Sequence, residues 1–575
     1  MVSIRVSSGV AMVWLTSLSF AHPNPMPDLA RALEAFDLTT SSPPTAGPLA
    51  SIGTMTNQDY AFLQLPPTQQ LLGLFGQHNA AMFNDSRLDV WTTMMAAMVK
   101  SKTDKWTQPH ANTSLTIPKV QKTLVKITLL NTQIQVPVED EDWPDDTALE
   151  VQAATYIRDV APFVDNFKDT WQDGESLETY VMSKVRPMWP PIHVVWFDRY
   201  SDHALELLAF HGVGAHLVEQ LSKMHTDGSY YALKLNFMDE LDVRPGFAKY
   251  GADAYFDKSG RVVKLVRQGQ TYGPRSDNWD YIKMAFRGSL MTKVTAIDHL
   301  MGLHMTVGNY FVTGSREQLP PDHPLRRLLK PFTFRTIAIN HAAARSLMWT
   351  KGYLHRALAL SEKGLAQTWQ YAIDNFKYET FPQQVARRNI DTKTIPFDQD
   401  GLSFWTVTRA FVSQYVDVYY ASDAAVTGDA PVVAFWAYLN SKLHNQLQPL
   451  SKAALKDTIA QAILSVTAMH NHMGSVAEYV SDPSFMPGAW VEGELASRPG
   501  PAVRQAVIMA MTGLTEPSIL EDFSHVMLHG KAKTVCRAFK TALVTLGQTL
   551  DVRNSEREQP LLSFHPRYMD ISIGI

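Results

Sequence analysis

The chain has 575 residues, of which 45% are hydrophobic and 19% charged, a balance typical of folded globular proteins. Its formal net charge of −4 offers no general attraction to phosphate backbones, so we do not expect a nucleic-acid partner. A single cysteine, Cys536, excludes an internal disulfide, and a chain of this length can be held together by its core alone.

The N-terminus, residues 1–21, has the pattern of a secretory signal peptide. Arg5 supplies positive charge, the stretch Val10–Phe20 is apolar, and small residues follow it. This run is too short to span a membrane, and no later run reaches the required length of about 18 apolar residues. Asn84 and Asn112 lie in N-glycosylation triplets. We therefore expect a secreted, soluble glycoprotein.

The rest of the chain predicts a flexible leader followed by one large domain. Residues 22–59 have turn and loop composition, whereas long helical periodicities dominate from Tyr60 onward. Helices are predicted at Phe75–Lys100, Leu149–Phe167, Ala204–Met224 and Trp279–Tyr310, and strands near Leu124–Val138 and Tyr255–Val266. No linker or internal repeat divides this part, so we predict a single, mainly α-helical domain over residues 60–575, with few short strands.

Two histidines lie inside the long helix predicted near residue 300. His299 and His304 are five residues apart, and on a regular α-helix, which turns about 100° per residue, they would sit off a common face. The spacing alone is weak, because His211 and His216 repeat it around two glycines. A π-turn brings residues i and i+5 closer into line. If His299 and His304 bind one metal ion, we expect the helix to be widened there.

A third histidine, His470, follows the helical run Ile459–Thr467. His472 is a rival two residues on, and on a helix it faces away from His470. Imidazoles suit iron, manganese or zinc, and a carboxylate as the remaining ligand would favour a redox-active or Lewis-acid metal. The sequence has no Gly-x-Ser-x-Gly, His-Glu-x-x-His or Gly-x-Gly-x-x-Gly motif, so hydrolase and dinucleotide sites are not indicated.

The order of motifs from about Trp279 to the end resembles that of lipoxygenases. The matching residues are His299-x4-His304, Leu319-Pro-Pro-Asp-His323-Pro324, Leu328-Leu-Lys-Pro331, Ile339-Asn340, Ala344-Arg345, Pro396–Trp405, Tyr415–Asp423, Thr467-Ala-Met-His470 and the terminal Ile575. The resemblance implies a catalytic domain of the short, microbial or fungal kind, without the N-terminal β-sandwich of plant and animal members.

The same resemblance implies one non-heme iron or manganese ion. Its protein ligands would be His299, His304, His470 and the terminal carboxylate of Ile575, with no other catalytic residue. The chain departs from the family at Gly474, where Asn, His or Ser is usual.

Three groups could compensate for this departure. Water could fill the ligand position at Gly474, or the side chain of Asn471 or His472 could turn toward the metal.

The implied reaction is the insertion of O2 into a polyunsaturated fatty acid to give a hydroperoxide, by a monomeric enzyme. Two alternatives stay open: a related oxygenase acting on a polyene secondary metabolite, and a catalytically silent lipid-binding relative.

Several other polar residues allow two interpretations. Lys283 and Arg287, one turn apart, could attract a fatty-acid carboxylate, although a solvated helix face is the simpler interpretation. His323 is expected to be structural, and Asp398 and Asp400 to be loop-capping carboxylates.

Overall fold

The computed structural model describes the backbone of residues 124–129 and 132–137 and most of residues 198–573. Gaps in the second range are 199, 321–322, 335, 337–338, 341–342, 344–346, 349–352, 391–394, 481–484, 496, 498–500, 502–504, 506–517 and 529. The predicted signal peptide, leader, both glycosylation sites, the helices near residues 75–100 and 149–167, and Ile575 lie outside the described residues. The boundaries of the predicted domain therefore stay predictions.

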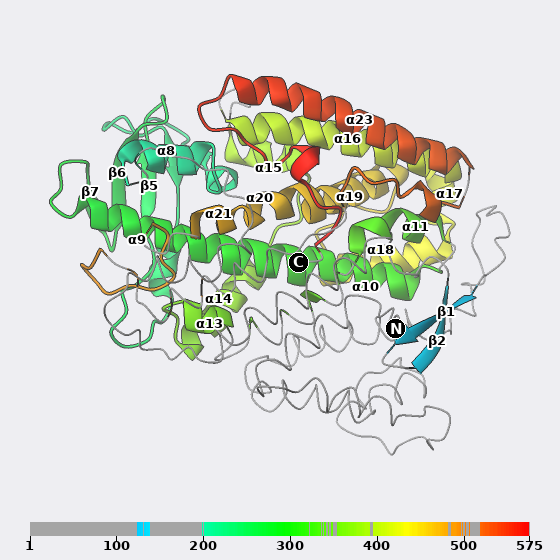
Figure 1. Cartoon of the computed structure of the whole chain (residues 1–575), viewed down its shortest axis with the longest axis horizontal. Coiled ribbons are helices and arrows are strands. Elements are labelled where there is room, and N and C mark those ends of the chain that lie inside the picture. Colours follow the sequence, from blue (N-terminus) through cyan, green and yellow to red (C-terminus); the bar gives the residue numbers. More distant parts are fainter. Residues whose placement is uncertain are drawn as a thin grey trace, which may run out of the picture.

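A long helical rod crosses the centre of the molecule (Figure 1). It consists of α9 (Trp279–Thr292), the π-helix η5 (Lys293–Gly308) and α10 (Asn309–Gln318). The junction residues Lys293 and Asn309 keep right-handed helical dihedrals, so the three segments run on without a break. The rod ends where Leu319 turns extended before Pro320, as expected for a residue that precedes proline.

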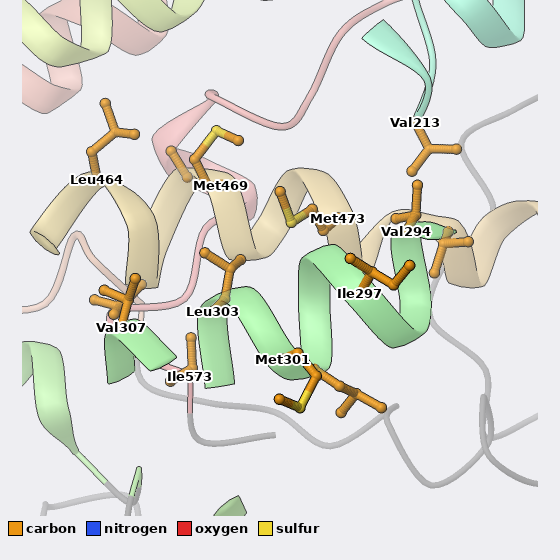
Figure 2. Packing of buried hydrophobic residues seen from close by; sticks show 14 of the residues in the cluster. Val213, Val294, Ile297, Met301, Leu303, Val307, Leu464, Met469, Met473 and Ile573 are labelled. Atoms are coloured by element: carbon orange, nitrogen blue, oxygen red, sulfur yellow. The ribbon is translucent and has the colours of Figure 1, made fainter. Parts of the chain in front are cut away.

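A second rod lies beside the first, above it in Figure 1. It consists of α19 (Lys452–Leu464), the short π-helix η7 (Ser465–Met469), α20 (His470–Gly474) and α21 (Val476–Val480). The Ser451 side chain starts it by accepting a hydrogen bond from the Ala454 amide, which satisfies one free N–H of the first turn. Figure 2 shows buried side chains of both rods: Leu303 reaches from the first rod toward the second, and Met469 lies on the far side of the second.

Further helices surround these two rods. The longest are α16 (Pro396–Tyr419) and α23 (Gly530–Ser555), which pack against each other on the outer side (Figure 1). The others are α8 (Asp202–Phe210), α11 (Pro324–Leu329), α13 (Tyr353–Ala357), α14 (Glu362–Asp374), α15 (Phe381–Arg388), α17 (Asp423–Thr427) and α18 (Ala430–Lys442), with 3-10 turns η3 (Ala215–Leu217), η4 (Asn236–Glu240), η6 (Pro331–Thr333), η8 (Ser524–Val526) and η9 (Pro566–Tyr568). None of the described helices is both long and apolar enough to cross a membrane.

The strands form two small antiparallel sheets. One is the hairpin β1 (Leu124–Leu129) and β2 (Thr132–Pro137); the other has the order β3 (Glu219–Gln220), β4 (Tyr231–Leu233), β5 (Asp253–Phe256), β6 (Val262–Arg267), β7 (Gln270–Tyr272). Both strand predictions are confirmed, and so is a mainly α-helical fold with few strands.

The helix predicted over Ala204–Met224 is wrong in its second half. α8 ends at Phe210, and the chain then turns into η3 and β3. A Cβ at Gly212 would lie 2.5 Å from the Tyr479 hydroxyl, so this turn packs too closely against α21 to carry a side chain.

Candidate metal centre

The π-helix η5 brings His299 and His304 together. In a π-helix each carbonyl accepts from the amide five residues on, and accordingly the Asn309 amide donates to the His304 carbonyl. The Thr306 hydroxyl likewise donates to the carbonyl five residues before it, that of Met301, at 2.7 Å. The Nε2 atoms of His299 and His304 are 3.3 Å apart. The helix is thus widened here, as we expect if both histidines bind one metal ion.

The second rod contributes His470 to the same point. Its Nε2 lies 3.1 Å from Nε2 of His304, and the nitrogens that the three rings offer all lie within 4.8 Å of one another. The rings are inclined at 53–68° with centroids 4.7–5.0 Å apart, so their edges, not their faces, converge. His470 stands directly after η7, so a π-turn precedes this ligand candidate as well.

Asn340 fixes the tautomer of His304. Its amide nitrogen donates to the His304 carbonyl at 2.7 Å, and its oxygen therefore faces Nδ1 of His304 at 2.8 Å. Nδ1 must carry the proton, which leaves the lone pair of Nε2 free toward the other two rings. Asn340 belongs to the Ile-Asn motif noted in the sequence, but nothing there had indicated this contact, which spans 36 residues.

All three imidazoles are held neutral. Burial lowers the pKa of His304 to about 4, and the hydrogen bond that the ring donates to Asn340 works in the opposite direction. Burial is also the main cause that lowers the pKa values of His299 and His470, with a smaller contribution from the neighbouring rings. Neutral imidazoles whose lone pairs converge are the donors that iron, manganese or zinc requires, so these residues fit a metal ion.

The two rival side chains make other contacts. His472 is fully buried, with Nδ1 3.1 Å from the Ser563 hydroxyl and Nε2 3.1 Å from Nδ1 of His216. The Asn471 side chain donates to the Ser563 carbonyl at 2.9 Å. At Gly474 an added Cβ would meet nothing within 4 Å, so there is open space at this position.

The chain's final described segment runs beside the π-helix. Ile573 packs so closely on Gly308 that a Cβ there would lie 2.1 Å from its Cδ1 atom, and the Ser572 hydroxyl donates to the Phe334 carbonyl at 3.0 Å. Figure 2 shows Ile573 beside η5, near Leu303 and Val307. Ile575 itself lies outside the described residues.

The prediction that Lys283 and Arg287 lie on a solvated face of α9 is wrong. Lys283 and Arg287 are only 3% and 2% exposed. Lys283 is buried because its ammonium pairs with Asp202 at 2.9 Å and Asp280 at 3.0 Å, and Arg287 donates to the Phe485 carbonyl at 2.6 Å. A fatty-acid carboxylate would have to displace these partners.

The two aspartates of α16 do not cap a loop. Asp398 and Asp400 stand in the first turn and a half of that helix, fully buried, where Asp398 pairs with Arg388 and Asp400 pairs with two arginines of the C-terminal region. His323 is structural as expected: its ring accepts from the Leu325 amide at the start of α11 and lies 3.2 Å from the Asp429 carboxylate.

Comparison with known proteins agrees with this geometry. Residues 257–470 match the family model described as lipoxygenase. The polyunsaturated fatty acid lipoxygenase ALOX15B of Rattus norvegicus is 24% identical over 332 residues, 52% of this chain and 49% of that protein. A linoleate 9/13-lipoxygenase of Pseudomonas aeruginosa is 28% identical over 212 residues, and the human hydroperoxide isomerase ALOXE3 is 28% identical over 194.

Solved structures show the same fold. The coral 8R-lipoxygenase superimposes with a TM-score of 0.65 at 14% identity, over 76% of each chain. A lipoxygenase crystallised with arachidonate gives 0.63 at 14% identity, over 80% of each chain.

These matches have a limited reach. The chain covers half or less of the length of these curated relatives: 49%, 30% and 27%. The family match itself ends at His470 and includes His299 and His304. Residues 257–470 thus carry a lipoxygenase domain by the family model, and the fold and the curated relatives agree with that family.

Proposed function

We propose that the protein is a dioxygenase that inserts O2 into polyunsaturated fatty acids to give hydroperoxides. The observation that carries this proposal is the convergence of three neutral imidazoles, His299, His304 and His470, from two separate rods. When bound there, an iron or manganese ion would supply the one-electron chemistry that removes hydrogen from the methylene between two double bonds.

The chain's own groups would hold this ion in a defined orientation. Each imidazole offers Nε2, and Asn340 keeps the proton of His304 on Nδ1. Because the group contains no carboxylate among the described residues, the ion's charge would be only weakly compensated unless another ligand joins.

The carboxylate of Ile575 is the proposed fourth ligand. Ile573 already packs on Gly308, one helical turn beyond His304. Two further residues reach at most about 7 Å in extended form. We therefore propose that the carboxylate of Ile575 joins the three imidazoles, and a residue appended after Ile575 would place an amide where we propose the carboxylate.

The surroundings of the histidines suit an apolar substrate. Ile297, Met301, Met469 and Met473 are all under 10% exposed, on both sides of the histidine-bearing helices (Figure 2). Sites for apolar ligands are lined mainly by such side chains, which also exclude water from a reactive intermediate.

Two measurements test the proposal on purified protein. Elemental analysis is expected to find about one iron or manganese per chain, and incubation with linoleic acid is expected to raise the conjugated-diene absorbance. Protein with neither metal would overturn the proposal and leave the silent lipid-binding relative. A C-terminal tag after Ile575 is expected to abolish the absorbance change, whereas an N-terminal tag is the matched control.

A related oxygenase acting on a different polyene is the second candidate. Gly474 favours this candidate, because glycine lacks the side-chain ligand that is usual at this position and leaves open space there. Metal in the protein without diene formation from linoleic acid would favour this candidate over the first.

Secretion is also a proposal, supported by the pattern of residues 1–21. N-terminal sequencing of protein collected from the medium is expected to begin after Ala21, and glycosidase treatment is expected to lower the mass through Asn84 and Asn112. An intact Met1 in exported protein would contradict it.

A further inference from the structure

A second set of polar groups is buried behind the metal-binding histidines. Ser563, His472, His216, Asp298 and Lys293 follow one another as a chain of contacts, here called the buried polar chain. The distances are 3.1 Å from Ser563 Oγ to His472 Nδ1, 3.1 Å from His472 Nε2 to His216 Nδ1, and 3.2 Å from His216 Nε2 to Asp298 Oδ2. Lys293 pairs with the other oxygen of Asp298.

The contacts occupy every ring nitrogen of His216 and His472. Asp298 is ionised beside Lys293 and accepts, so His216 must donate from Nε2. Nδ1 of His216 and Nε2 of His472 then share one hydrogen bond, and Nδ1 of His472 shares another with the Ser563 hydroxyl. Every ring nitrogen of the two histidines is thereby occupied, and neither ring has a lone pair to offer a metal.

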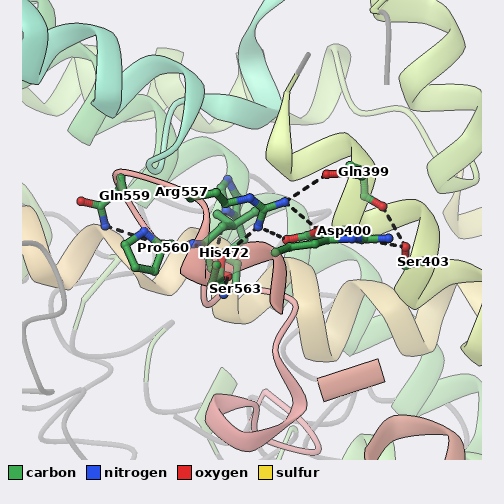
Figure 3. Close-up of polar contacts among 11 residues, drawn as sticks. Gln399, Asp400, Ser403, His472, Arg557, Gln559, Pro560 and Ser563 are labelled. Carbon is green, nitrogen blue, oxygen red and sulfur yellow. Dashed lines mark hydrogen bonds and ion pairs between the residues drawn. The ribbon is translucent and has the colours of Figure 1, made fainter. Parts of the chain in front are cut away.

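The members come from the elements that carry the metal ligands. Asp298 directly precedes His299 on η5, and His472 lies two residues after His470 on α20. Ser563 belongs to the segment that leads to the end of the chain, and Figure 3 shows it next to His472. One connected set of hydrogen bonds thus joins both ligand-bearing helices to the C-terminal segment.

An aromatic ring packs against the two histidines of the buried polar chain. The ring of Phe397 lies with its centroid 4.5 Å from that of His472 and 6.3 Å from that of His216. Phe397 is 1% exposed and His472 is fully buried, so water has little access to compete for these hydrogen bonds.

We propose that the buried polar chain positions the ligand set: His216, His472 and Ser563 are positioning residues that hold His299, His470 and the C-terminal segment in register. This inference depends on the proposed metal-binding function. It assigns His472 a role distinct from that of a rival ligand, because turning toward the metal would break the link to His216. Breaking the chain is expected to loosen the metal without removing a ligand.

The experiment compares variants that break the chain at different links. Ser563→Ala removes the hydroxyl donor. His216→Gln keeps a donor toward Asp298 but loses the group that contacts His472, whereas His216→Asn keeps a polar group toward His472 and loses the donor toward Asp298. Tyr420→Phe is the matched control, because Tyr420 donates a similarly buried hydrogen bond to Asp429 at 2.7 Å, away from the ligand set.

The readouts are the rate at which metal-loaded protein loses its ion to a chelator and the electron paramagnetic resonance spectrum of the bound ion. The three variants are expected to release metal about 10-fold faster, the lower end of what outer partners of metal sites contribute, and to alter the spectrum. Tyr420→Phe is expected to lower the melting temperature with wild-type release and spectrum. Release and spectra in the three variants that match either wild type or Tyr420→Phe would overturn the inference. A wild-type protein that takes up no metal would instead refute the proposed function.

Discussion

Two buried polar regions of this molecule differ in how their polar groups are paired. Between α16 and α23, the Asp400 carboxylate is fully buried but receives Arg557 at 2.6 and 3.0 Å and Arg553 at 2.9 Å (Figure 3). At the candidate metal centre, three buried imidazoles turn lone pairs toward one another. In the first region the buried charges pair with one another, whereas in the second the imidazole lone pairs stay available to bind a cation.

The difference separates the residues that stabilise the fold from those that bind the metal. A buried, fully paired carboxylate holds two helices in place, and removing one partner is costly because the others stay charged. Neutral imidazoles facing one another gain little from each other, but they become strong ligands once a cation lies between them. We therefore expect substitutions in the first region to destabilise the fold, and substitutions in the second to remove the metal ion.

The largest effect is expected from removing a ligand. His299→Ala, His304→Ala and His470→Ala should each lose most of the metal and lower dioxygenase activity by more than the roughly 100-fold that an outer partner can contribute. Elemental analysis and the conjugated-diene assay measure this. The control is His203→Ala, whose exposed ring contacts Glu206 and Glu558. A ligand variant with full metal content would remove that residue from the set.

Removing the carboxylate between α16 and α23 should act on stability instead. Asp400→Ala leaves Arg553 and Arg557 without their buried partner, at a cost of about 3–5 kcal/mol in the free energy of unfolding. Urea denaturation measures it. Arg261→Ala, at the exposed pair with Asp257, is expected to cost less than about 1 kcal/mol. The fraction of Asp400→Ala protein that stays folded should keep its metal. Loss of metal from folded protein would contradict the separation of the two regions.

A smaller effect is expected at Asn340. Asn340→Leu removes the acceptor that holds the proton on Nδ1 of His304, so metal affinity should fall about 10- to 100-fold. Asn340→Asp keeps an acceptor and should retain most of the affinity. Titration with a competing chelator distinguishes the two, and equal affinities for both variants would show that the hydrogen bond does not orient the ligand.

The smallest effect is expected at Gly474, where a side chain would enter open space. The position is four residues after His470 and so lies on the same helix face. Gly474→Asn adds an oxygen donor and is expected to slow metal release by less than about 10-fold, the lower bound for outer partners. Gly474→Ala, which adds no donor, should raise only the melting temperature. Faster release from Gly474→Asn would mean that the space does not face the ion.

Much of this arrangement was predictable because it is local. Helical periodicity predicted the first rod, and the five-residue spacing of His299 and His304 predicted its π-helical widening. The motif around His470 identified the third imidazole. In each case the information lies within a few turns of one helix.

What could not be predicted depends on contacts between distant segments. The pair His216 and His472 is separated by 256 residues, and nothing in either helix indicates the other. Lys283 looked solvated because its charge matched an outer face, yet Asp202, 81 residues away, buries it. Periodicity reports which face of a helix is apolar, but it carries no information on the partner that a polar side chain will find.

The π-helix also governs what lies beyond it. Widening the turns of η5 changes the rotation at which α10 emerges, and α10 presents Gly314 to Phe435 and Tyr438 of α18, where an added Cβ would lie 2.8–3.1 Å from their rings. Deleting one residue inside η5 would therefore rotate this contact away by about 100°. The packing of α10 on α18 therefore constrains the number of residues in η5, and variation in chain length has to be absorbed outside the continuous helix Trp279–Gln318.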